Sequence, residues 1–78
     1  MFTQQMMDDL NLLVKFPTES MLQGIKVHHD ADQSVISACN RLYANGIISQ
    51  EDGGYLTDLG QDLSHHANVL MQALKGSQ

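Results

Sequence analysis

The segment Asn45–Gly60, NGIISQEDGGYLTDLG, carries the signals for one helix end, a β hairpin and a new helix start. Asn45-Gly46 is typical of a helix C-terminus, because glycine tolerates the left-handed backbone that closes the last turn. Ile47-Ile48 and Tyr55-Leu56 are short β-prone runs, and Asp52-Gly53-Gly54 between them is a turn sequence. The segment therefore predicts a helix, a hairpin and a second helix.

The residues after the hairpin predict a long final helix over about 58–75. Thr57 can cap it through its hydroxyl, and Asp58 suits the positive end of the helix dipole. A helix, a two-stranded wing and another helix are the second half of a winged helix-turn-helix domain. We therefore expect a mainly α fold with a small antiparallel β hairpin, winged helix-turn-helix-like: three helices, the wing and a C-terminal helix.

The residues before Asn45 supply the other predicted helices. Residues 3–15 predict the first, with Thr3 as its cap and Phe16-Pro17 as its end, because proline disfavours helical backbone in the preceding residue. Thr18 to Ser20 would open a short second helix that carries Met21, Leu22 and Ile25. The run Ile25-Lys26-Val27-His28 could instead form a brief strand beside the wing.

The third predicted helix starts at Asp30 or Asp32, runs to about Ala44, and is the recognition helix of this architecture. Its apolar stripe predicts a face turned to the core, formed by Val35, Ile36, Cys39, Leu42 and Tyr43. The opposite face carries side chains that can hydrogen-bond base edges: Gln33, Ser34, Ser37, Asn40 and Arg41. This polar face could also be the solvated side of an amphipathic helix.

Length and charge limit the possible functions. A chain of 78 residues is expected to form a single domain, 1–78, with one small core. Four Lys and Arg against nine Asp and Glu give a net charge of −5, whereas nucleic-acid binding depends on basic side chains. The acidic residues include Asp30 and Asp32 at the start of the recognition helix and Glu51 and Asp52 at the wing tip. These positions favour a basic protein partner over DNA.

The final helix predicts a second contact surface. Leu59, Leu63, Ala67, Leu70 and Leu74 form a stripe expected to pack on the domain. Three further apolar residues lie partly outside it: Val69, Met71 and Ala73. So wide an apolar arc favours a homodimer through this helix, although burial in a deep groove of the same chain is the alternative.

The sequence contains no catalytic pattern, and we expect neither an enzyme nor a bound cofactor. Asp62 and His66 are spaced to chelate a metal ion, but no thiolate cluster completes a site, so His28, His29, His65 and His66 are read as surface residues. Cys39 is expected to be a reduced core residue.

No apolar run reaches the roughly 18 residues of a membrane span, and the acidic N-terminus does not resemble a secretory signal, so a bacterial cytoplasm is expected.

Two resemblances follow from these motifs. GGYLTDLGQDL resembles the junction between wing and helix in winged-helix regulators, which implies DNA binding through the third helix. LNLLVKFP, GIKVHHDAD, RLYANGIIS and GGYLTDLG, in this order, resemble a small uncharacterised gammaproteobacterial family of about this length. That family implies no activity, cofactor or site residue. The fold favours the first interpretation, a non-enzymatic DNA-binding regulator, and the charge favours the alternative, an acidic protein-interaction module that does not bind DNA.

Overall fold

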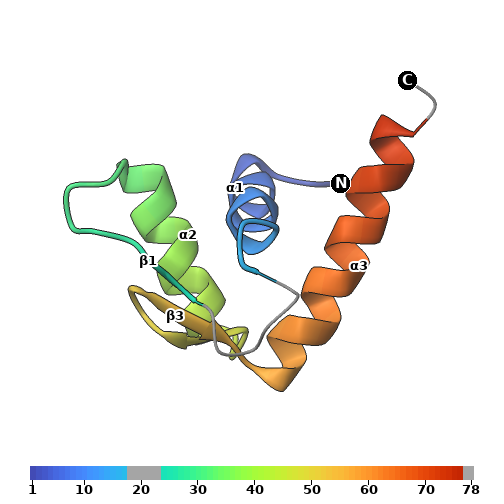
Figure 1. The fold of residues 1–78 in the computed structure, drawn as a ribbon. Helices are drawn as coiled ribbons and strands as arrows, with labels where there is room; N and C mark the ends of the chain where they lie inside the picture. Colours follow the sequence, from blue (N-terminus) through green and yellow to red (C-terminus); the bar gives the residue numbers. More distant parts are fainter. Residues whose placement is uncertain (18–23, 77–78) are drawn as a thin grey trace.

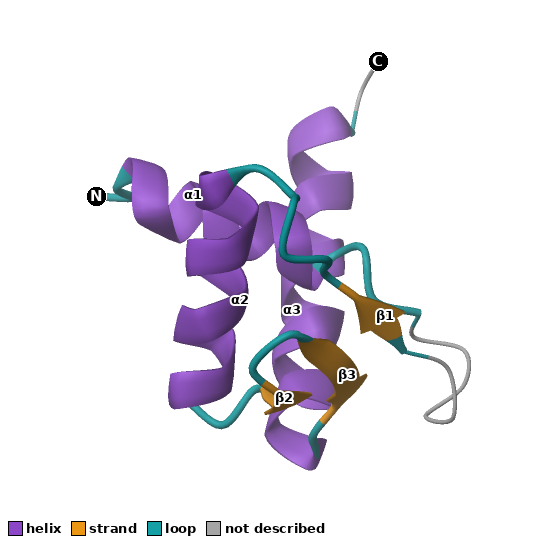
Figure 2. Cartoon of the chain, turned by 90° about the vertical axis from the view of Figure 1, so that its left-hand side faces the viewer, coloured by secondary structure: helices purple, strands orange, loops and turns teal. Residues whose placement is uncertain are grey.

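The computed structural model describes residues 1–17 and 24–76. Within these ranges the order of elements is α1 (Gln4–Leu13), β1 (Ile25–Lys26), α2 (Gln33–Ala44), β2 (Ile48–Gln50), β3 (Gly53–Leu56) and α3 (Asp58–Lys75). Helix α1 lies between α2 and α3, and the strands lie where α2 ends and α3 begins (Figures 1 and 2). The described part of the chain is therefore mainly α, with three helices and a small three-stranded antiparallel sheet.

The first helix is capped as expected and ends earlier than expected. Thr3 Oγ1 accepts a hydrogen bond from the N–H of Met6 at 3.1 Å, which satisfies one of the free donors at the helix start. Helix α1 ends at Leu13 rather than at residue 15, because the next residues tighten into a turn in which the N–H of Phe16 bonds the carbonyl of Leu13. The short helix predicted from Thr18 lies outside the described residues.

The sheet confirms the strand that was the alternative interpretation of residues 25–28. Ile25 lies in β1, not in a helix, and β1 pairs with β3 so that Ile25 is opposite Gly54 and Lys26 is opposite Gly53. β3 also pairs with β2 and is thus the central strand, in the order β1-β3-β2. The predicted two-stranded wing is extended by a third strand that comes from the other side of α2 in the sequence.

The turn of the hairpin begins one residue earlier than expected, at Glu51 instead of Asp52. Glu51 and Asp52 form it, whereas Gly53 and Gly54 already belong to β3, with φ angles of 128° and 75°. A Cβ atom on Gly53 would clash with the carbonyl oxygen of Ile25. Gly53 therefore serves a purpose beyond the turn, because it lets β1 approach the hairpin closely, while a Cβ atom on Gly54 would clash with Ser49 Oγ of β2.

The junction between α2, the hairpin and α3 forms as predicted. Gly46 has a φ of 74° and its N–H bonds the carbonyl of Tyr43, while the N–H of Ile47 bonds the carbonyl of Leu42, as in a Schellman motif. Thr57 Oγ1 accepts from the N–H of Gly60 at 3.0 Å and caps α3. The same hydroxyl group lies 2.6 Å from the Gly46 carbonyl oxygen, to which it donates. Thr57 thus connects the end of α2 to the start of α3.

The core gathers residues from all three helices and the hairpin. Its buried members are Leu12, Leu13, Phe16, Ala38, Cys39, Leu42, Ile48, Leu56 and Ala67. The expectation that Tyr43 faces the core is wrong, since this side chain is 47% exposed. Ala38 is fully buried in its place, because the face of α2 that packs against the rest of the domain is centred on Ala38, Cys39 and Leu42.

Candidate nucleic-acid interface

Helix α2 presents most of its predicted recognition face to solvent. Gln33, Ser34 and Asn40 are exposed, and Ser37 is half-buried. The side-chain amide of Gln33 donates a hydrogen bond to Ser37 Oγ at 3.3 Å, one turn further along the helix. These four side chains keep the hydrogen-bonding groups that could contact base edges or a polar protein surface.

Arg41, the fifth predicted site residue, is engaged inside the protein. Its Nε lies 2.9 Å from Oδ1 of Asp9 on α1, and its Nη2 lies 2.9 Å from the same oxygen. Nη2 also approaches the backbone carbonyl oxygen of Gln5 at 3.5 Å. A charge-assisted pair of this kind joins α1 to α2 and neutralises the guanidinium group. The recognition face therefore lacks the cation that the sequence placed on it.

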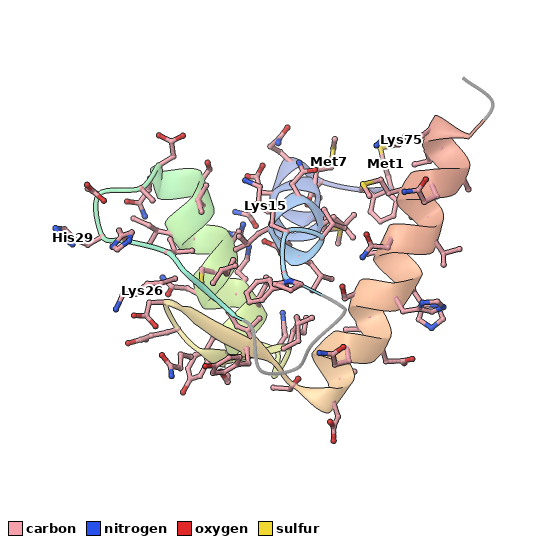
Figure 3. The ribbon with its side chains drawn as sticks, viewed as in Figure 1. Met1, Met7, Lys15, Lys26, His29 and Lys75 are labelled. Carbon is pink, nitrogen blue, oxygen red and sulfur yellow. The ribbon has the colours of Figure 1, made fainter. Side chains whose placement is uncertain are left out.

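Of the remaining basic residues, Lys15 supplies an exposed cation near this face, and the others do not replace Arg41. Lys26 Nζ lies 3.3 Å from Asp52 Oδ2 in the hairpin, so its charge is also compensated. Lys75 is in the last turn of α3, and Lys15 lies between α1 and α2, beside Ser34 (Figure 3). Arg41 and Lys26 do not converge into one positive patch, because the first pairs with α1 and the second with the hairpin.

Acidic side chains border the same face. Asp30 and Asp32 are exposed at the start of α2, and Asp32 makes no capping hydrogen bond through its side chain. Glu51 is exposed at the tip of the hairpin. Phosphate groups that approached the N-terminus of α2 would meet these carboxylates, which repel them.

The histidines and Cys39 show no arrangement for metal chemistry within residues 1–17 and 24–76, where no group of three His, Cys, Asp or Glu side chains is placed to hold an ion. His66 Nε2 lies 3.7 Å from Asp62 Oδ1, and both side chains are exposed. His28 and His29 are exposed in the loop before α2. Burial, and to a lesser extent the charge of Asp52, raises the pKa of the Cys39 thiol, which makes it a poor nucleophile.

A second surface, between α1 and α3, was only partly anticipated. A groove of about 400 Å³ is lined mainly by apolar side chains, among them Phe2, Met7, Leu10, Val14, Leu70 and Leu74, which we call the α1–α3 groove. The expected packing stripe of α3 was wrong for Leu59, Leu70 and Leu74, which are exposed. The buried face of α3 is formed by Gly60, Ser64 and Ala67 instead. Small residues on this face let α3 pack closely against the rest of the domain. The leucines of α3 lie at the edge of this contact.

The spacing of apolar residues along α3 predicted a second contact surface on this helix. No sequence pattern around Phe2 and Met7 shows that these two residues take part in it. Phe2 precedes α1 and Met7 lies in its first turn, and only the tertiary fold brings them beside the end of α3. Figure 3 shows Met1, Met7 and Lys75 at this end of the molecule. None of the helices in the described ranges is long and apolar enough to cross a membrane.

Comparison with known protein families gives a match over most of the chain. Neither the curated proteins nor the solved structures contain a significant match to this chain. The model of the Family of unknown function (DUF5669) matches residues 1–75, nearly the whole chain. The chain therefore belongs to the Family of unknown function (DUF5669).

Proposed function

We propose that this chain is a non-enzymatic, winged-helix-like module that docks on a basic protein partner. The docking surface is the acidic face formed by α2, the loop before it and the tip of the hairpin. A helix followed by a hairpin and a further helix supports the winged-helix assignment, with α2 in the position of the recognition helix. The additional strand β1 covers the free edge of β3.

The observation that carries this proposal is the ion pair between Arg41 and Asp9. It removes the one arginine of the chain from the exposed face and leaves polar side chains such as Gln33 and Asn40 beside carboxylates. A surface of this composition attracts cationic side chains and repels phosphate groups. The net charge of −5 acts in the same direction over the whole molecule.

A charge-matched pair of variants tests the docking surface. Asp30→Asn/Asp32→Asn removes two charges beside α2, and Asp58→Asn/Asp62→Asn removes two charges from the start of α3. We expect the immobilised wild-type chain and the α3 variant to retain a basic partner from a lysate of the source organism. Salt should elute this partner, and the α2 variant should fail to retain it. Equal retention by both variants would contradict the proposal.

DNA binding is the second candidate, and the exposed amides of Gln33 and Asn40 favour it. In this case Gln33, Ser34, Ser37, Asn40 and Arg41 would form the interface, and Arg41 would have to leave Asp9. Fluorescence anisotropy with a short DNA duplex at low salt separates the two candidates. DNA binding requires a steep loss of affinity with salt, weaker binding by Arg41→Ala and tighter binding by Asp9→Asn, which frees the guanidinium group. The protein-partner proposal expects no binding by any of the three proteins.

A further inference from the structure

A mainly apolar groove, the α1–α3 groove, lies on the surface of the described part of the chain. Most of the exposed large apolar residues belong to the N-terminal segment, α1 or α3: Met1, Phe2, Met6, Met7, Leu59, Val69, Leu70 and Leu74. Leu74 is 76% exposed although it lines the groove. The C-terminal half of α3 extends beyond the sheet, and among the described elements α1 lies beside it (Figure 1). Contiguous apolar surface of this kind marks an interaction site on a small protein.

The charges around the groove show which partner fits. Among the described residues, Lys75 is the only charged residue in its lining. The acidic residues that give the chain its net charge of −5 lie elsewhere, so two copies can approach through this surface with little repulsion. A strongly basic partner would find no carboxylate in the groove to pair with.

Helix α3 also carries an apolar ridge that complements the groove. Its C-terminal half carries Val69, Leu70, Ala73 and Leu74, which form an exposed apolar ridge at helical spacing. The ridge and the groove share Leu70 and Leu74, and therefore lie on one continuous surface. A two-fold contact requires such a self-complementary surface. We propose that the α1–α3 groove receives the C-terminal half of α3 from a second copy of this chain, in a symmetric homodimer.

The test is the mass of the protein in solution, measured by light scattering during size-exclusion chromatography over a dilution series. The wild-type chain is expected at twice 8.6 kDa. Leu74→Asp places a charge in the groove twice per dimer and should raise the dissociation constant at least about 100-fold. Tyr43→Asp introduces the same charge at another exposed apolar position and should leave the dimer intact. Circular dichroism establishes that both variants are folded.

A second measurement needs no variant. With isotope-labelled methionine methyl groups, the signals of Met7 and Met71, which line the groove, should shift as the wild-type protein is diluted. A wild-type monomer at every concentration or a dimer that survives Leu74→Asp would overturn the inference, as would methyl signals that stay constant while the measured mass falls from dimer to monomer. Failure of the dimer test would leave the proposal of a basic protein partner on the acidic face untouched, because the two surfaces have no residue in common.

Discussion

Gly60, in the first turn of α3, lies directly against the backbone carbonyl oxygen of Ile47, with no room for a side chain between them. Ile47 precedes β2 and Gly60 begins the helix that follows β3, so this contact closes the hairpin against α3. Thr57 supports the same contact, since its N–H bonds the Ile47 carbonyl at 3.0 Å. The entry angle of α3 thus depends on the absence of a Cβ atom.

Gly60→Ala is therefore expected to destabilise the protein, although alanine is the better helix former by about 1 kcal/mol. The added methyl group would overlap a backbone carbonyl that cannot rotate away, and we expect a loss of about 3 kcal/mol. Gly46→Ala is the matched control, because nothing lies within 4 Å of its Cβ position and only the positive φ, about 1–2 kcal/mol, opposes it. Urea unfolding measures both. A Gly60→Ala variant as stable as the wild type would contradict this packing.

Thr57→Val removes a hydroxyl group with three partners and leaves the shape of the side chain nearly unchanged. The variant loses the cap on Gly60 and the contacts with the carbonyl oxygens of Gly46 and Ile47. We expect the free energy of unfolding to fall by about 2 kcal/mol. Thr57→Ser keeps the hydroxyl group and should stay within about 0.5 kcal/mol of the wild type in thermal or urea unfolding. Equal losses in both variants would show that packing, not hydrogen bonding, is the contribution of Thr57.

The cap at Thr57 and the helix end at Asn45-Gly46 were identifiable from the sequence, because their partners are close along the chain. Thr57 and Gly60 are three residues apart, and Asn45-Gly46 carries its own backbone preference. The same reasoning predicted the bounds of α3 and the cap at Thr3. Strand β1 was one of two open interpretations of residues 25–28, since two residues carry too little periodicity to distinguish a strand from a helix.

The candidate site was harder to predict, because it depends on contacts between distant residues. Arg41 and Asp9 are 32 residues apart, and no local pattern on α2 shows that Arg41 faces α1. Tyr43 has the spacing of a core residue, but the packing of α1 decides which side of α2 is buried. Similarly, Leu70 and Leu74 of α3 have core spacing, and their exposure follows from the length by which α3 extends beyond its neighbours.

The ion pair between Arg41 and Asp9 should contribute measurably to stability. The two side chains are 29% and 23% exposed, so solvent screens the pair only in part. Arg41→Ala leaves the Asp9 carboxylate half-buried without its partner, and we expect a loss of about 1–2 kcal/mol. Asp9→Asn should cost less, because the amide oxygen still accepts a hydrogen bond. A double-mutant cycle that gives no coupling energy between the two positions would show that the pair does not stabilise the contact between α1 and α2.

Cys39 should make stability depend on pH in the alkaline range. In the folded protein burial, followed by the charge of Asp52, raises the pKa of the thiol, whereas in the unfolded chain the thiol ionises near its ordinary value of about 8.5. Below that value the thiol is protonated in both states, and its contribution is fully present. As the pH rises towards the higher pKa of the folded state, the unfolded state releases the proton first, and stability falls. Urea unfolding of the wild type should therefore weaken more steeply above about pH 8.5 than that of Cys39→Ala, which shares every other titrating group. Parallel curves for the two proteins would mean that the thiol ionises as readily in the core as in water, which contradicts the burial of Cys39 on the inner face of α2.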